Sequence, residues 1–579
     1  MRRPPSSTSP GVALLTLLSA RFFSSTAVDA ASTLNLKNLS HRNRIRALAE
    51  ARLALTEYLH ATRTLPFSLA DHIASNSPIS LRSFVSQISF ADAIPADFRR
   101  IVRGFLAYNP VNEFGFFFES IGLDPSHPSL PSGTPLFLSD DACLLSAVSS
   151  FLRFGFPWNF LGVLYLDSPS IFSSPPGHLL HLLQRFEGLG FPRSCIIAIC
   201  ITFPSILRAT DDDVENELLL RDLKILFVDS DLAGWAGDDV DAFIGFCKRI
   251  RLFYDFGLEK GGVGELMGCS RRIFLELDEL VLAQKFNFFL NLGMRMEEVG
   301  LFTLNNPVTL DLDLDNADIV IPDYLIRVGL SNEEADSLMK RCPYVMGKNK
   351  LGSLPGIVKA LDLNEWFLTK VVHEKNLHFL SPSYTHIGSY NRNLETEFLQ
   401  DLERIKLVKP HQFIGIKVDF FLSIGFGKNM ITSKAIGLVS GSKEPFQERF
   451  DCLIGLGIEH SMLCRMIIAA PKLLNQCKDM LLEKVNYLSQ DLGYPIEYLN
   501  IFPSFLCFDL ENRVKPRYRI LNWLRDTGLI NKTFAPSTVI VHSEKRFIFI
   551  LSNIHPAAPK QWLEQFCSHK GNNVVEETI

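Results

Sequence analysis

Residues 450–476 read FDCLIGLGIEHSMLCRMIIAAPKLLNQ, and residues 480–529 read MLLEKVNYLSQDLGYPIEYLNIFPSFLCFDLENRVKPRYRILNWLRDTGL. Both segments follow one plan: an amphipathic helix ends at Leu-Gly, a second apolar helix ends before a proline, and a short turn carries a large apolar residue. Gly457 and Gly493 supply the left-handed backbone conformation that ends a helix without strain. The pattern therefore predicts one structural unit that occurs twice.

The same glycine recurs from about residue 116 onward. It closes an apolar helical pattern at Gly122, Gly155, Gly190, Gly257, Gly293, Gly329, Gly425, Gly457 and Gly493. Successive differences are 33, 35, 67, 36, 36, 96, 32 and 36 residues, so the two large gaps hold about two and three units. We therefore expect degenerate copies of the unit inside both gaps.

A proline follows five of these glycines at the same distance of 14 residues. These prolines are Pro169, Pro204, Pro307, Pro343 and Pro471, and three residues past them lie Phe172, Leu207, Leu310, Met346 and Leu474. In the last copy Pro503 comes ten residues after Gly493, and Leu506 follows it. Proline ends the second helix because it lacks an N–H donor and disfavours helical geometry in the residue before it. The apolar residue is then expected to pack back in a short turn.

A unit of about 35 residues cannot bury its own apolar stripe, so successive units must stack. We therefore predict an all-α solenoid of degenerate helical repeats. The expected organisation is a targeting presequence at residues 1–23, an N-terminal helical region at 24–115, a repeat array at 116–530, and a capping segment with a tail at 531–579.

The first 23 residues have the charge bias of an organellar presequence, with Arg2, Arg3, Arg21 and no acidic residue. Arg21 precedes Phe-Phe-Ser-Ser, which resembles a mitochondrial processing site. A secretory signal is the rival interpretation, but 11 cysteines at irregular spacing argue against that route. We predict a mitochondrial location, with the chloroplast as the alternative. No apolar run reaches the ~18 residues of a membrane-spanning helix, so no membrane partner is expected.

Motifs for catalysis or metal binding are missing from the sequence. The cysteines form no CxxC pair and no Cys/His cluster of zinc-site form. Residues 260–265, KGGVGE, resemble a deviant phosphate loop, but Glu265 stands where the lysine and the Ser/Thr should begin. Neither GxSxG nor HExxH occurs. We expect no enzymatic activity, no cofactor and no metal.

The order helix, Leu-Gly, helix, Pro-x-x-Leu, helix, repeated at 32 to 36 residues, resembles the mitochondrial transcription termination factor family, mTERF. The most specific segment is residues 502–529, which carries the proline-leucine turn and the Arg-x-x-Pro-Arg element of that family as Pro503, Leu506, Arg513, Pro516 and Arg517. The segment from Ser537 onward resembles the cap after the last repeat. The resemblance covers roughly residues 120–567 and is greatest to plant organellar members.

This resemblance implies a right-handed superhelix whose groove holds nucleic acid, usually double-stranded DNA. It implies a role in mitochondrial transcription, including termination, or for some plant members in RNA processing such as intron splicing or rRNA maturation. It also implies phosphate contacts from arginine and lysine, and no catalysis. The expected partner is organellar double-stranded DNA or RNA, bound by a monomer. The alternative from another class is a protein-binding scaffold for transcription or ribosome-assembly proteins.

The net charge of the chain argues against tight binding to nucleic acid, but its distribution indicates where phosphate contacts would lie. The chain has 58 basic and 63 acidic residues, a net charge of -5. Residues 24–400 hold 33 basic and 45 acidic residues, or -12, whereas residues 401–579 hold 22 and 18, or +4. The excess is concentrated in residues 511–546, with eight basic and three acidic residues. We predict phosphate contacts there from Arg513, Lys515, Arg517, Arg519, Arg525, Lys532, Lys545 and Arg546. For Arg513 and Arg517, a capping or inter-repeat role remains the alternative.

Overall fold

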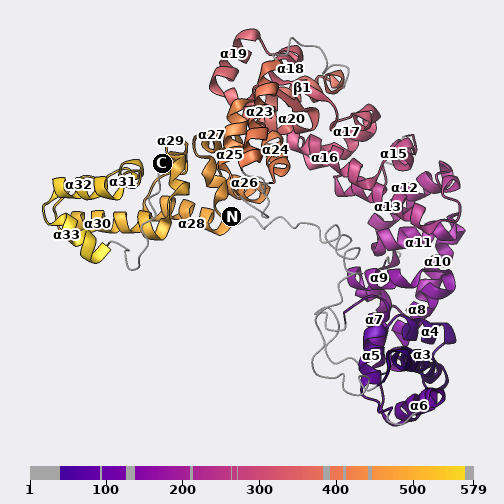
Figure 1. Ribbon diagram of the computed structural model, residues 1–579. Helices are drawn as coiled ribbons and strands as arrows, with labels where there is room; N and C mark the ends of the chain where they lie inside the picture. Colours follow the sequence, from indigo (N-terminus) through magenta and orange to yellow (C-terminus); the bar gives the residue numbers. More distant parts are fainter. Residues whose placement is uncertain are drawn as a thin grey trace. The chain divides into compact units, whose positions relative to one another are not determined.

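The computed structural model describes residues 39–90, 94–124, 137–208, 213–262, 264–269, 271–381, 392–408, 413–440 and 446–566. The predicted presequence at residues 1–23 lies outside these ranges. Nearly all of the described chain is helical (Figure 1), which confirms the predicted all-α class. None of the helices in the described ranges combines the length and apolar character that crossing a membrane requires.

The chain divides into two compact units, a division that the sequence did not predict. Unit 1 comprises Met1–Arg251 and Glu259–Phe274, and unit 2 comprises Leu252–Leu258 and Leu275–Ile579. Each unit has its own apolar core. Phe151 and Phe243 are fully buried in unit 1, as are Phe286 and Phe421 in unit 2.

Unit 1 opens with a small helical bundle and continues into repeats. In the bundle, α3 packs against α4, α5 and α6. The helices up to the unit boundary are α3 (His41–Glu57), α4 (Phe67–Ser75), α5 (Pro78–Ser86), α6 (Phe98–Tyr108), α7 (Glu113–Ser120), α8 (Ala142–Phe154), α9 (Leu161–Asp167), α10 (His178–Gly188), α11 (Arg193–Thr202), α12 (Val214–Lys224), α13 (Val240–Asp255), α14 (Gly264–Cys269) and α15 (Arg271–Glu276).

Unit 2 holds the remaining repeats and the C-terminal segment. Its helices are α16 (Glu279–Leu292), α17 (Met296–Asn305), α18 (Ile321–Val328), α19 (Asn332–Arg341), α20 (Leu354–Ala360), α21 (Asn364–Leu368), α23 (Arg392–Val408), α24 (Ile414–Ser423), α25 (Met430–Leu438), α26 (Phe446–Gly455), α27 (His460–Ala469), α28 (Lys478–Asn486), α29 (Tyr498–Ile501), α30 (Lys515–Asp526), α31 (Pro536–Ile540), α32 (Glu544–Ile554) and α33 (Ala558–Gln561). In one repeat, α26 contacts both α27 and α28, as stacked units require.

The marks that defined the repeat in the sequence have the predicted structural roles. All nine repeat glycines have a positive φ, between 70° and 119°. The six prolines each begin a short 3₁₀ helix: η6 (Pro169–Ser173), η7 (Pro204–Arg208), η10 (Pro307–Asp311), η11 (Pro343–Val345), η15 (Pro471–Asn475) and η17 (Pro503–Cys507). The apolar residue three positions later is buried in five copies. Met346 is half-buried, and the chain turns there into a strand.

Aspartate replaces glycine inside the two large gaps. Asp231 and Asp362 follow helical segments with φ of 54° and 59°. Aspartate tolerates this left-handed conformation better than most residues with a side chain. Asp362 lies 33 residues after Gly329, where the period requires a helix end. Asp362 therefore ends a helix where the period predicts a degenerate copy, with a different residue at the turn.

Unit 2 also contains an unpredicted antiparallel strand pair, β1 (Asp318–Val320) and β2 (Lys348–Lys350). Buried asparagines connect this region to the following repeat. Asn349 in β2 donates its side-chain amide to the carbonyls of Leu422 and Phe426 at 3.2 and 2.8 Å. Asn429, which caps α25, donates back to the carbonyls of Tyr344 and Met346, both at 2.7 Å. These bonds satisfy backbone groups that the irregular turns leave unpaired.

Candidate nucleic-acid interface

Six basic side chains in the repeats point inward and donate to backbone carbonyls. The pairs are Arg249 with Phe274, Lys285 with Leu312, Lys417 with Val439, Arg449 with Leu474, Lys484 with Leu506, and Arg517 with Val539. In every pair the cation lies 22 to 27 residues before its acceptor, so it joins one repeat helix to a later segment of the same repeat. We call these six residues the internal cations.

Burial separates the internal cations from a binding surface. Lys417 is 0%, Lys484 is 1% and Arg517 is 2% exposed. Burial lowers the pKa of Lys285, Lys484 and Arg517, because the charged form loses water. Their hydrogen bonds to carbonyls compensate part of that cost. This set was not predicted from the sequence, although a lysine or arginine eight or nine residues before a repeat glycine marks five of its members.

Arg513 and Arg517 converge on the C-terminal end of α31. Arg513 donates through Nε to the carbonyl of Ile540 at 3.0 Å and through Nη2 to that of His542 at 3.2 Å. Arg517 Nη1 donates to the carbonyls of Val539, Ile540 and His542 at 2.9, 3.1 and 2.7 Å. The last carbonyls of a helix lack partners and carry its negative dipole end, so cations are stabilised there.

This geometry favours the capping alternative for both arginines. Arg517 also forms an ion pair with Glu544 at 3.2 Å, and its guanidinium lies 4.6 Å from the ring centroid of Phe547. Arg513 stacks at 4.5 Å over Phe508. The Arg-x-x-Pro-Arg element therefore attaches the last repeat helix to the capping segment, and Arg517 is too buried to meet a phosphate.

Lys515 is held between two carboxylates. Its Nζ lies 3.0 Å from Glu483 and also contacts Glu511. The hydrogen bond with Glu511, followed by that with Glu483, raises the pKa of Lys515. A phosphate would have to displace these partners.

The other five predicted residues are exposed and form no ion pair with any described residue. They are Arg519, Arg525, Lys532, Lys545 and Arg546, which we call the C-terminal basic surface. Arg519 and Arg525 lie on α30, Lys532 lies between α30 and α31, and Lys545 and Arg546 lie in the first turn of α32.

Few acidic side chains oppose this surface. Within residues 511–546, Glu511 pairs with Lys515 and Glu544 pairs with Arg517. Asp526 is the remaining acidic residue of the segment, so five cations minus one anion leave a local charge of +4. The C-terminal basic surface thus keeps most of the local excess available to an anionic partner.

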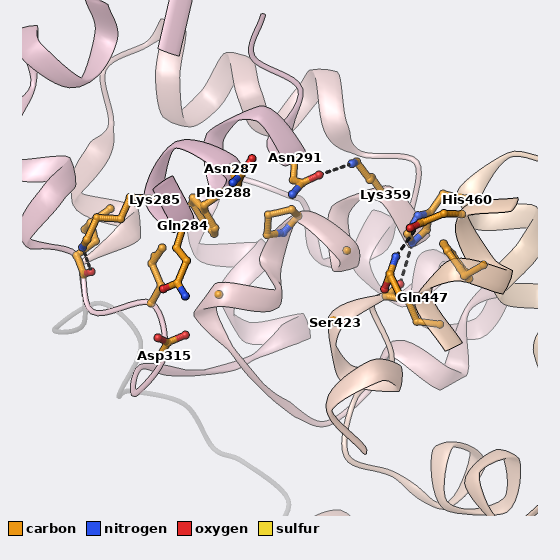
Figure 2. Close-up of a pocket in the computed structure, with 18 of the residues that line it drawn as sticks. Gln284, Lys285, Asn287, Phe288, Asn291, Asp315, Lys359, Ser423, Gln447 and His460 are labelled. Atoms are coloured by element: carbon orange, nitrogen blue, oxygen red, sulfur yellow. Dashed lines mark hydrogen bonds between the residues drawn. The ribbon is translucent and has the colours of Figure 1, made fainter. Parts of the chain in front are cut away.

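A polar cleft of about 730 Å³ lies elsewhere in unit 2, between α16, α20, α26 and the turn after α24. Gln284, Asn287 and Asn291 line it from α16, where their spacing places them on one face. Figure 2 shows Asn291 facing Lys359 of α20, whose Nζ lies 3.5 Å from the Asn291 Oδ1. His460 binds the carbonyl of Ile424 at 2.8 Å on the opposite wall. None of these residues was predicted from the sequence.

The glycine-rich segment at residues 260–265 has a structural role in unit 1. The backbone N–H groups of Gly261 and Gly264 donate to the carboxylate of Asp222 at 2.6 and 2.9 Å. Asp222 is fully buried, and its carboxylate already accepts the N–H groups that a phosphate loop would direct at a phosphate. Over the ranges that the structure describes, no group of three or more His, Cys, Asp or Glu side chains is placed to hold a metal ion.

Comparison with known proteins identifies the family. The mTERF family model matches residues 244–352 and 407–548. The mitochondrial transcription termination factor MTEF18 of Arabidopsis thaliana is 37% identical over 532 residues, which cover 91% of this chain and 94% of that protein. The chain belongs to the mTERF family. The chloroplastic transcription termination factor MTERF8 of Arabidopsis thaliana is 23% identical over 359 residues, or 58% of this chain and 69% of that protein.

The mTERF segments cover the two candidate surfaces to different extents. The C-terminal basic surface lies inside 407–548, whereas the polar cleft takes α16 from 244–352, α26 from 407–548, and Lys359 of α20 from between the two segments. The N-terminal bundle lies outside them. Similarity to the mitochondrial factor along most of the chain confirms the predicted mitochondrial location, since the chloroplastic relative is more distant.

Proposed function

We propose that this mTERF protein binds double-stranded DNA of the mitochondrion and regulates its transcription, including termination. The observation that carries the proposal is the C-terminal basic surface, where five exposed cations have no ion-pair partner among the described residues. The two Arabidopsis relatives are both named transcription termination factors, which supports the same class of role. Regulation would come from occupancy of the DNA and would involve no catalytic step.

Phosphate neutralisation supplies the binding energy in this proposal. Each cation that meets a phosphate releases condensed counterions, which makes affinity depend on salt. Such contacts fix the position and orientation of a protein on a duplex but do not read its sequence. Among the internal cations Arg517 contributes indirectly, since its bonds to Val539, Ile540 and His542 hold α30, which presents Arg519 and Arg525. A chain with net charge -5 needs this local concentration of positive charge to attract DNA.

A salt series with short duplex DNA tests the proposal. Changing Arg519, Lys545 and Arg546 together to alanine should weaken binding and reduce the slope of log K against log salt by about 2.7, or ~0.9 for each lost phosphate contact. The matched control changes Arg153, Lys340 and Arg341 to alanine, which removes the same charge from exposed positions outside this surface. An unchanged slope in the first variant, or an equal change in the control, would contradict the proposal.

Single-stranded RNA is the second candidate partner, because the polar cleft carries uncharged hydrogen-bonding groups suited to bases. The same salt series on RNA distinguishes the two partners, since single strands give a shallower slope of ~0.7 per contact. A protein-binding scaffold remains the alternative from another class, based on the charge of -12 over residues 24–400. Absence of salt-dependent binding to either nucleic acid would favour the scaffold.

A further inference from the structure

We propose that the polar cleft of unit 2 binds an unpaired nucleobase of a single-stranded nucleic acid. The inference rests on the proposed nucleic-acid-binding function and adds a site that is separate from the C-terminal basic surface. What carries it is the alignment of three side-chain amides on one wall, opposite a lysine, in a cleft of about 730 Å³. That volume lies within the ~300–1,000 Å³ typical of small-ligand sites.

The wall formed by α16 has the chemistry of base recognition. Gln284, Asn287 and Asn291 are exposed and share one face, and each amide offers two N–H donors and a carbonyl acceptor. Base edges present donors and acceptors in the same plane, and asparagine and glutamine pair with them through two bonds. The remaining cleft-lining residues of this helix face are apolar, apart from Lys285, which is turned to the carbonyl of Leu312. The wall is therefore polar without a free charge.

The other walls add one cation and an apolar residue to the cleft. Lys359 donates to Asn291, and burial lowers its pKa. Two buried aromatic residues line the cleft, Phe288 from α16 and Phe450 from α26, with 5% and 2% exposure. A heteroaromatic ring that enters the cleft would place its edge against the amides and its apolar faces toward these lining residues. Figure 2 shows the amide-bearing helix and Lys359 on facing sides of the space.

Charge around the cleft excludes a polyphosphate as occupant. Three carboxylates, those of Asp313, Asp315 and Asp451, line it, against the single available ammonium group of Lys359. Asp451 also accepts the side-chain amide of Gln447 at 2.8 Å. A free nucleotide would bring its phosphates next to these carboxylates. A base inserted from a strand avoids this conflict, because its backbone stays at the mouth of the cleft.

The test compares strands that differ in bases and not in phosphates. Full-length protein is titrated with a short single-stranded RNA, with the DNA of the same sequence, and with matching strands whose central nucleotides are abasic. Wild type should bind the intact strand about tenfold more tightly than the abasic strand, as one base contact provides. The RNA and DNA arms decide which sugar the site accepts.

Variants assign this difference to the cleft. Asn287→Ala with Asn291→Ala should bind the intact strand about tenfold more weakly and no longer distinguish it from the abasic strand. Gln284→Ala tests the first amide of the row separately. Gln400→Ala, an exposed amide on α23 outside the cleft, should behave as wild type. All four side chains are exposed, so folding should be preserved, and thermal melting checks it.

The inference is overturned if wild type binds intact and abasic strands equally, or if the double variant still distinguishes them. Failure of the proposed function looks different. In that case neither duplex nor single strands bind in a salt-dependent manner, and the arginine and lysine variants have no effect. Duplex binding that depends on the C-terminal basic surface, together with no preference for intact single strands, would overturn the cleft alone.

Discussion

Arg517 and Arg519 lie two residues apart on α30 and have opposite environments. Arg517 is 2% exposed and donates three hydrogen bonds to the end of α31 through Nη1, whereas Arg519 is exposed. Arg517→Ala should lower the free energy of unfolding by about 3 kcal/mol, because buried carbonyls lose a charged donor. Urea unfolding measures this loss, and the DNA affinity of the folded fraction should stay unchanged.

Arg519→Ala is the matched variant and should give the reverse result. Its free energy of unfolding should stay within about 0.5 kcal/mol of wild type. The slope of log K against log salt for duplex DNA should fall by about 0.9, since one phosphate contact is removed. If Arg517→Ala instead reduced the slope without destabilising the protein, this result would support the phosphate contact that the sequence predicted for Arg517.

His460 gives a prediction about pH. Burial lowers the pKa of its imidazole below the usual ~6.5, and nearby Lys359 lowers it further, against the hydrogen bond to Ile424 and the charges of Asp362 and Asp451. Between the folded pKa and about 6.5 the unfolded chain binds more protons, so stability rises with pH in that window and levels off above it.

The corresponding measurement is urea unfolding at roughly pH 5.5 and roughly pH 7.5. Wild type should lose more stability on acidification than His460→Gln, which cannot titrate there. Comparing the two proteins cancels the contribution of every other titrating group that they share. Equal losses would mean that His460 has the same pKa in the folded and unfolded chains.

At the scale of elements, the sequence predicted features that depend on local backbone rules. Gly457 ends the first helix of its repeat and Pro471 ends the second, whatever surrounds them. The spacing of such residues therefore revealed the repeat. Asp362 was missed because aspartate takes a left-handed turn only where packing demands it. The pairing of β1 with β2 was missed for a related reason, since three-residue strands depend on partners distant in sequence.

Close contact between repeats makes Gly356 a test of element packing. A Cβ atom added to this residue of α20 would lie 2.0 Å from the carbonyl oxygen of Ser423. Gly356→Ala should therefore force a backbone shift and lower the free energy of unfolding by about 1–3 kcal/mol.

Gly104→Ala is the control for that substitution. Gly104 is also inside a helix, α6, but nothing lies within 4 Å of an added Cβ atom. This change should stabilise the protein by about 0.5–1 kcal/mol, because alanine loses less backbone entropy than glycine in a helix. Denaturant unfolding compares both variants. Destabilisation of similar size at both positions would mean that crowding at Ser423 is not the cause.

At the scale of the whole molecule, counting charge found the region of the candidate interface but could not choose among its members. Eight cations share residues 511–546, and the count weighs them equally. The structure turns Arg513 and Arg517 toward carbonyls and places Lys515 between two glutamates. Such differences arise from tertiary packing. A charge count treats a lysine such as Lys484 in the same way whether its side chain faces solvent or a buried carbonyl.

The number of exposed cations without an ion-pair partner in the C-terminal basic surface predicts how the intact protein responds to salt. Five exposed residues in the C-terminal basic surface can release counterions from at most five phosphates, so the slope of log K against log salt on duplex DNA should be no steeper than about -4.5. The acidic remainder of the chain, with -12 over residues 24–400, should add no contacts. A steeper slope would mean that further cations reach the DNA, with exposed Arg42, Arg46 and Arg52 of α3 as the first candidates. Replacing these three with alanine would then lower the slope, whereas under the present proposal it leaves the slope unchanged.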